Sequence, residues 1–248
     1  MKLEQYLNII QNFIADKLTE TNLKGYVLGL SGGIDSALVA ALCSKAVPGK
    51  LLTLIMPCDS HEDDLHDATA VANHFGLPYQ VIDLTPSYRV LLKDLEATSE
   101  ASGAPLDDLA RHNLKVRLRM VTLYAFAQAR KAMVLGTDNW DESYTGYFTK
   151  YGDGAVDLLP IVELTKGEVY EASRLLGVPN QVLNRAPSAG LFPGQTDEGE
   201  MGVKYADLDA FLLGKKVAPE ITKRIKQLHA VSAHKRDPIP RPAPFIRS

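Results

Sequence analysis

Cysteine is scarce in this sequence. There are two, Cys43 and Cys58, and they do not form a C-x-x-C pair. This usage argues against a disulfide framework and a structural zinc site, and it fits a reducing compartment such as the cytoplasm. No run approaches 18 apolar residues, so no membrane span is expected. Charges interrupt the apolar positions of the N-terminal segment, which is unlike a signal peptide.

Neither sign of charge dominates the chain. Lys and Arg total 27 against 30 Asp and Glu, a net charge of −3. A global basic field is therefore missing, and no nucleic-acid partner is expected. With 46% apolar residues, 248 residues suffice for one α/β domain with a full core. We expect a single domain over 1–248 that ends in an extended, proline-rich tail at 237–248.

Buried strand-like runs alternate with helix-like segments along most of the chain. The strand-like runs are 26–30, 51–57, 79–84 and 131–137. Helical patterns are found at 3–18, from Ile34 onward, and at 61–76, 105–131, 164–177, 205–213 and 219–233. This alternation predicts an α/β fold: a Rossmann-like parallel sheet with helices on both faces.

Some segments indicate a subunit interface or an active site in addition to the sheet and its covering helices. The helix over 105–131 has apolar residues around most of its circumference, so it is expected to be buried nearly all round, with a partner subunit covering one side. Residues 138–160 show little periodicity and are interpreted as an active-site loop region. The polar segments 85–104 and 184–204 are expected to be loops that act as lids.

The string SGGIDS, residues 31–36, is the strongest local signal. It follows a buried strand and opens a helix, so its glycines let the backbone approach phosphate oxygens at the helix N-terminus. Asp35 would repel phosphates unless a divalent cation lies between them. The string is neither a Walker A loop nor a G-x-G-x-x-G fingerprint. The alternative is an ordinary glycine turn with a capping serine.

The complete string resembles the pyrophosphate loop of the N-type ATP pyrophosphatases, which have a Rossmann-like fold of the adenine-nucleotide α-hydrolase type. Members of this family cleave ATP between the α- and β-phosphates and adenylate a substrate. The segments 113–120, 135–160, 164–166, 187–202 and 232–236 are similar to those of one branch, the ammonia-dependent NAD synthetases. The resemblance implies a homodimeric ligase that amidates deamido-NAD to NAD with ATP, Mg²⁺ and ammonia, through an adenylate.

The same resemblance implies roles for individual residues. Asp35 and Lys166 would be catalytic, and Asp35 and Glu142 would hold Mg²⁺. The positions that would bind ATP are Gly29, Leu30, Ser31, Gly32, Gly33, Ile34, Asp35, Ser36, Thr137, Lys166 and Ser188. The positions that would bind deamido-NAD are Arg117, Lys150, Asp157, His234 and Lys235, the last two reaching the site of the neighbouring subunit.

Structural roles remain open for several of these residues. Arg117 is equally explained by an ion pair at a subunit interface, Glu142 by a surface position, and His234 with Lys235 by a solvated helix end. Cys58 is interpreted as an inert buried thiol rather than the catalytic cysteine of a tRNA-thiolating relative. A non-catalytic nucleotide sensor is the rival from another class.

Ammonia is mostly protonated at neutral pH. A carboxylate pocket could therefore capture ammonium and take its proton, and the sequence does not identify that group. Only about 24 residues precede the first strand, and no amidotransferase domain is apparent. Free ammonia is therefore the expected nitrogen donor, unless a separate glutaminase supplies it.

Overall fold

The computed structural model describes residues 1–185, 187 and 196–247 of the chain. Its centre is a parallel sheet with the strand order β3-β2-β1-β4. Val27 in the middle of the sheet pairs with Leu52 on one side and with Val134 on the other. The strands are β1 (Gly25–Gly29), β2 (Leu51–Ile55), β3 (Tyr79–Val81) and β4 (Ala132–Leu135). The predicted parallel α/β sheet is confirmed.

Side chains of the central strands alternate between two hydrophobic clusters, one on each face of the sheet. In β1, for example, Tyr26 and Leu28 belong to one cluster and Val27 to the other. The first face is covered by α1 (Leu3–Thr21), α2 (Ile34–Ala46), α3 (Glu62–His74) and α7 (Lys166–Leu176). The second face is covered by α4 (Thr85–Ala101) and α5 (Asp108–Arg130).

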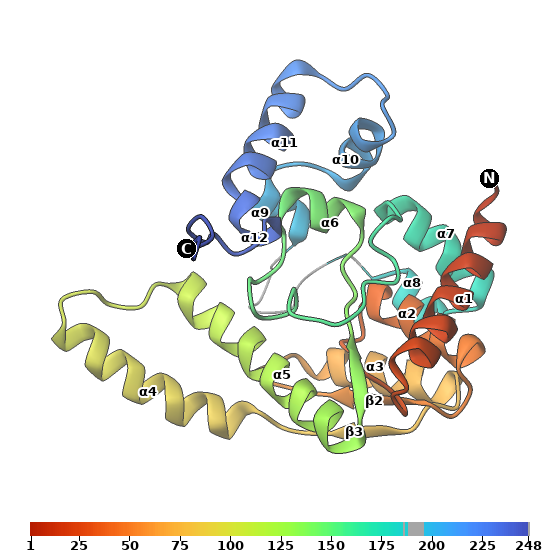
Figure 1. Ribbon diagram of the computed structural model, residues 1–248, viewed down its shortest axis with the longest axis horizontal. Helices are drawn as coiled ribbons and strands as arrows, with labels where there is room; N and C mark the ends of the chain where they lie inside the picture. Colours follow the sequence, from red (N-terminus) through yellow and green to blue (C-terminus); the bar gives the residue numbers. More distant parts are fainter. Residues whose placement is uncertain (186, 188–195, 248) are drawn as a thin grey trace.

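A third apolar cluster, around Tyr205, Leu208 and Ile225, holds a group of helices beyond one end of the sheet (Figure 1). Tyr144 and Tyr147, from the segment after β4, pack against this cluster. The helices that follow α5 and belong to this region are α6 (Trp140–Thr145), α9 (Asp197–Met201), α10 (Tyr205–Leu212), α11 (Pro219–Val231) and α12 (Ala233–Arg236). A short helix, α8 (Asn180–Leu183), follows α7.

The expectation of a loop at 85–104 is wrong, because most of this segment is α4. Pro86 lies in the first turn, where its fixed φ is tolerated. Leu84, Tyr88 and Leu92 follow at four-residue spacing and pack in the cluster beneath α5. The polar and glycine content that suggested a loop is concentrated at the C-terminal end of this helix.

The helix predicted over 105–131 is buried on one face in the single chain, so the covering of its other face by a partner subunit stays a prediction. The helix begins at Asp108, because the Asp107 carboxylate caps it by accepting a hydrogen bond from the Ala110 N–H at 2.7 Å. One face packs on the sheet through residues such as Val116, but Leu109 is 67% exposed and Val121 is 53% exposed.

The remaining expectations are the loops at 138–160 and 184–204 and the absence of a membrane-spanning helix. Residues 138–160 are not continuous loop, since they contain α6. Within 184–204, residues 197–201 form α9 and much of the remainder lies outside the described residues, so the lid there stays a prediction. None of the helices in the described part of the chain is long and apolar enough to span a bilayer.

Candidate active site

A cavity of about 560 Å³ opens at the carboxyl ends of β1, β2 and β4. Ligands bind at this edge of open α/β sheets, because neighbouring loops diverge there. The sheet contributes Gly29, Ile55 and Leu135 to the wall, and α5 contributes a second wall. Most of the predicted ATP- and substrate-binding positions line this one cavity: Gly29, Leu30, Ser31, Gly33, Ile34, Asp35, Ser36, Arg117, Thr137, Glu142, Lys150, Lys166, His234 and Lys235.

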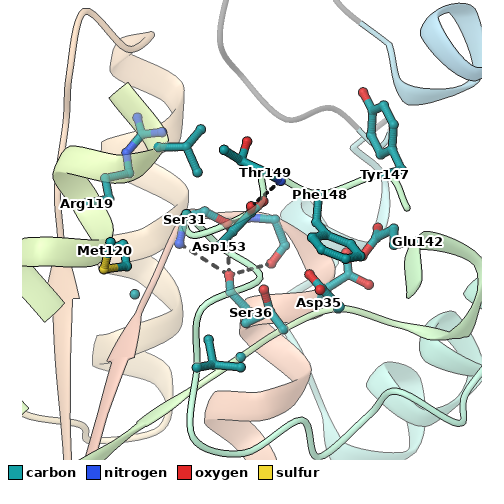
Figure 2. A pocket seen from close by; sticks show the side chains of 18 of the residues that line it. Ser31, Asp35, Ser36, Arg119, Met120, Glu142, Tyr147, Phe148, Thr149 and Asp153 are labelled. Atoms are coloured by element: carbon teal, nitrogen blue, oxygen red, sulfur yellow. Dashed lines mark hydrogen bonds between the residues drawn. The ribbon is translucent and has the colours of Figure 1, made fainter. Parts of the chain in front are cut away.

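The turn formed by Ser31, Gly32 and Gly33 is held by its own hydroxyl groups. The Ser36 Oγ donates to the Gly33 carbonyl at 3.0 Å and lies 3.0 Å from the Ser31 Oγ (Figure 2). Gly32 has φ of +84°, and a Cβ there would lie 2.8 Å from the Asp64 carbonyl oxygen, so only glycine fits without strain. Helix α2 begins directly after Gly33, and its first-turn N–H groups lack intrahelical acceptors. The predicted anion-binding turn is therefore formed.

Three predicted residues converge at the entrance to α2. The Lys166 Nζ donates to the Asp35 Oδ2 at 2.6 Å and to the Glu142 Oε1 at 3.2 Å. Figure 2 shows Asp35 and Glu142 pointing toward the same region beside Phe148. The lysine side chain is 3% exposed, so its charge is removed from water. Burial opposes that charge, but Asp35 and Glu142 more than offset it and raise the pKa of Lys166.

Residues that sequence reasoning missed complete this cluster. The Asn139 Nδ2 donates to the Asp35 Oδ1 at 2.9 Å, and the Asn139 Oδ1 accepts from the Glu142 N–H at 3.0 Å. The Tyr205 hydroxyl contacts the Glu142 Oε1 at 3.2 Å and the Asp197 Oδ2 at 3.0 Å. Burial raises the pKa of Glu142 to about 7, although the attraction of Lys166 opposes this shift. The N-x-x-E spacing is a capping-box signal for Asn139, whereas Tyr205 and Asp197 carry no comparable local signal.

The N-terminus of α7, which carries Lys166, is held by two carboxyl groups. The Asp141 Oδ2 accepts from the Lys166 N–H at 2.8 Å, and the Asp209 Oδ2 accepts from the Gly167 N–H at 2.9 Å. A capping box at Thr165 begins this helix, and Gly177 in the left-handed conformation ends it. Burial, together with the neighbouring charge of Asp209, raises the pKa of Asp141 to about 8.

Asp141→Asn is expected to make the protein less sensitive to alkaline pH. Because the folded pKa is about 8 and an unfolded aspartate titrates near 3.9, the folded state holds a proton that the unfolded state releases between these values. The free energy of unfolding therefore falls as pH rises through this window. Asparagine retains an oxygen for the Lys166 N–H and needs no proton. The Tm of both proteins is compared at pH 5 and pH 9. The fall in Tm between these two values should be larger for the wild type than for Asp141→Asn, by roughly 3 °C or more.

The control for this comparison is Asp16→Asn, on the exposed side of α1. Its Tm should follow that of the wild type at every pH. Parallel curves for wild type and Asp141→Asn would show that this carboxyl group does not hold a proton in the folded state.

The predicted deamido-NAD residues divide into two groups. Arg117 donates to the Lys150 carbonyl at 3.2 Å, the Lys150 Nζ donates to the His234 carbonyl, and the Lys235 Nζ donates to the Gly146 carbonyl at 2.7 Å. These four predicted residues therefore meet at the rim of the cavity in their own chain. Asp157 does not join them, because its Oδ2 accepts from the Val134 N–H at 2.7 Å beside β4.

The remaining predicted positions are less informative. Ser188 lies outside the described residues, and Thr137 lines the cavity directly after β4. Gly32 shapes the turn from behind and does not line the cavity. Cys58 is buried, and burial raises the pKa of its thiol, as expected of an inert cysteine.

The structure combines a parallel α/β sheet, a glycine turn at a helix N-terminus and a buried cluster of acidic and basic groups. These features define a nucleotide-binding α/β protein equipped for charge-stabilised chemistry. A sequence model of the NAD synthase family matches residues 6–239. The chain belongs to the NAD synthase family, and the resemblance inferred from its motifs is confirmed.

Individual relatives agree with this assignment. The chain is 46% identical over 233 residues to the NH₃-dependent NAD⁺ synthetase of Carboxydothermus hydrogenoformans. The aligned region covers 94% of this chain and 95% of the relative. It is 42% identical over 247 residues to the enzyme of the same name from Mesoplasma florum, with 100% of both chains covered. Among solved structures, the NMN synthetase of Francisella tularensis superimposes with a TM-score of 0.91 at 40% identity, covering 98% of this chain and 99% of that one.

Proposed function

We propose that this chain amidates the nicotinate carboxylate of deamido-NAD with ammonia, cleaving ATP to AMP and pyrophosphate through an adenylate. The observation that carries the proposal is the Asp35–Lys166–Glu142 cluster, which lies beside the glycine turn in a single cavity. The family, and the activity named for its relatives, support the same reaction.

Adenylation brings a carboxylate up to a triphosphate, so positive charge must be supplied at the phosphates. The N–H groups at the start of α2 and the hydroxyls of Ser31 and Ser36 are placed to bind the departing pyrophosphate. Lys166 can turn its ammonium from Asp35 and Glu142 to the phosphates, where it neutralises developing charge. Thr137 and the end of β1 frame the nucleotide from the sheet.

The donor set fits Mg²⁺. Oxygens of Asp35 and Glu142 lie 2.6 and 3.2 Å from one cation, the Lys166 ammonium, so both can face a common positive charge. Among the described residues, no group of three or more His, Cys, Asp and Glu is placed to hold a metal. Mg²⁺ commonly takes only one or two carboxylates and completes its shell with water and substrate phosphates. When bound with ATP, the ion would neutralise phosphate charge.

The comparisons favour one second candidate, in which the substrate is the mononucleotide counterpart of deamido-NAD. The Francisella tularensis NMN synthetase superimposes with a TM-score of 0.91, against 0.77 for an NH₃-dependent NAD synthetase from Campylobacter jejuni. Both substrates present the same nicotinate carboxylate, and they differ in whether a second nucleotide is attached. The residues at the cavity rim, Arg117, Lys150 and His234, would therefore decide between them.

One assay tests the proposal and separates its alternatives. The protein is incubated with ATP, Mg²⁺, ammonium and either deamido-NAD or nicotinate mononucleotide, and kcat/KM is measured for each. We expect NAD and AMP in equal amounts, with deamido-NAD preferred by at least tenfold. Preference for the mononucleotide would reassign the substrate. Formation of ADP, or of AMP only when tRNA is added, would contradict the proposal.

We further propose that the enzyme is a cytoplasmic homodimer with its active sites at the subunit interface. The exposed apolar residues of α4 and α5, which include Val90, Leu109 and Val121, form a surface suited to a second copy. The resemblance assigns His234 and Lys235 to the site of the neighbouring subunit, but both line the cavity of their own chain. Light scattering on the eluted protein should give twice the chain mass of 27.1 kDa, and a monomer would exclude this assembly.

A further inference from the structure

Tyr205 connects the outer group of helices to the acidic and basic cluster of the active site. It is the first residue of α10, which lies beyond one end of the sheet (Figure 1), and it is 6% exposed. Its ring belongs to the third apolar cluster, with Leu208 and Ile225. Its hydroxyl reaches the active site, where it lies 3.2 Å from the Glu142 Oε1. This side chain therefore belongs to both the packing of the outer helices and the site.

The face of the Tyr205 ring is one of the partners of the Lys166 ammonium. The Lys166 Nζ lies 4.9 Å from the ring centroid, which is within the range of a cation–π contact. Two carboxylate oxygens also hold this ammonium, the Asp35 Oδ2 at 2.6 Å and the Glu142 Oε1 at 3.2 Å. Because the lysine side chain is buried, water weakens the attraction of the ring little.

These partners of Lys166 differ in what happens to them during the ATP step. In the proposed reaction Asp35 and Glu142 face Mg²⁺, while Lys166 turns to the phosphates. The carboxylate oxygens are then shared with the metal, whereas the face of an aromatic ring is not a ligand for this hard cation. The ring of Tyr205 is therefore a contact that Lys166 can keep throughout the step. An ammonium that is already held in place needs less reorganisation when phosphate charge develops.

The orientation of the ring is fixed at both ends of the residue. The Tyr205 hydroxyl lies 3.2 Å from the Glu142 Oε1 and 3.0 Å from the Asp197 Oδ2, and a phenol has one hydrogen to donate. Whichever oxygen accepts that hydrogen, the outer edge of the ring is anchored. At the other end, the Tyr205 N–H donates to the Glu198 Oε1 at 2.9 Å. The ring face is thus preorganised toward Lys166.

We propose that Tyr205 is a positioning residue for the ATP step, whose ring holds the Lys166 ammonium at the entrance to α2. This inference rests on the proposed adenylation and adds a residue that acts through Lys166 rather than through the substrate. The alternative is packing alone, because the same ring fills space in the third apolar cluster. The two roles differ in one respect, since only the first depends on the charge of Lys166.

The test compares Tyr205→Phe, which keeps the ring, with Tyr205→Met, whose flexible chain fills much of the space without a ring. ATP–pyrophosphate exchange is measured with deamido-NAD and Mg²⁺ but no ammonium. We expect exchange by Tyr205→Phe within about fivefold of wild type. Tyr205→Met should lower the kcat of exchange roughly thirtyfold, the effect expected of a desolvated cation–π contact, and leave the KM for ATP within about threefold.

A double-mutant cycle with Lys166→Met separates the two roles, and radiolabelled pyrophosphate makes the slow exchange of that variant measurable. Once the ammonium is gone, Tyr205→Met should lower exchange by less than about threefold further. An equal loss in both backgrounds would overturn the inference, because packing alone would explain it. The cycle is repeated on Tm without ligands. There the combined fall should be smaller than the sum of the two single falls, since the contact can be lost only once.

Phe211→Met is the matched control. Phe211 lies on the same helix and packs against the same cluster, but its ring faces Tyr144, with 5.8 Å between the ring centroids. This variant should lower the Tm while its exchange stays within about threefold of wild type. A loss of exchange as large as that of Tyr205→Met would overturn the inference, because any aromatic ring of the cluster would then serve.

The remaining outcomes also decide the matter. Exchange by Tyr205→Phe as slow as that of Tyr205→Met would overturn the inference, because the hydroxyl and not the ring would be the group that acts. If Tyr205→Met does not fold, Tyr205→Leu takes its place in every comparison. If the wild-type protein itself shows no exchange with deamido-NAD, the proposed function fails instead.

Discussion

Asp35→Asn is expected to fold normally and to lose turnover by roughly a thousandfold, equivalent to about 4 kcal/mol of transition-state stabilisation. The amide retains an oxygen for the Asn139 Nδ2, which lies 2.9 Å away, and the Lys166 ammonium keeps its ion pair with Glu142, so the fold is kept. It loses the negative charge that faces Lys166 and that we assign to Mg²⁺. The rate of NAD formation and the thermal unfolding curve are measured on the same preparation.

Two results would count against this role of Asp35. A folded variant with turnover within tenfold of wild type would show that the charge is dispensable. A variant that fails to fold would leave Asp35→Glu to decide. That variant keeps the charge, so it should fold and respond to Mg²⁺ even if misplacement of the carboxylate slows turnover.

Lys166→Met is expected to lower turnover by at least a hundredfold, about 2.7 kcal/mol, and to make folding depend on Mg²⁺. The wild-type ammonium lies 2.6 Å from the Asp35 Oδ2 and 3.2 Å from the Glu142 Oε1, away from water. Removing one partner of a buried ion pair costs about 3–5 kcal/mol, because the other charges stay buried without compensation. A divalent ion between the two carboxylates would restore much of this loss.

The measurement that tests this position of the metal is the rise in Tm when Mg²⁺ is added without nucleotide. It should be several degrees larger for Lys166→Met than for wild type, in which the ammonium already occupies the position between the carboxylates. Lys166→Arg preserves the charge and should behave like wild type in this measurement. Equal Mg²⁺ responses in all three proteins would place the metal elsewhere.

The elements of the sheet could be predicted because their signals are local. Buried apolar runs defined the strands, and the glycine turn of residues 31–36 marked the junction of β1 with α2. The segment 85–104 was misjudged because the polar residues at its end outweighed the four-residue spacing of Leu84, Tyr88 and Leu92. The exposure of α5 depends on what covers it, which periodicity alone does not reveal.

The site could be predicted only as far as its residues lie in recognisable strings. Asp35, Glu142 and Lys166 were found in this way, and the structure brings them together. Tyr205 was missed because it lies in none of these strings, and only the fold brings it to Glu142.

The most direct test of the account follows the oxygen atoms of the carboxylate. Deamido-NAD labelled with ¹⁸O in both carboxylate oxygens is converted with ATP, Mg²⁺ and ammonium. The masses of the products are then measured by mass spectrometry. If the carboxylate attacks the α-phosphorus beside Asp35 and Lys166, the AMP carries one ¹⁸O, the NAD retains one and the pyrophosphate has none. Label in inorganic phosphate or pyrophosphate, or AMP without label, would contradict cleavage of ATP through an adenylate.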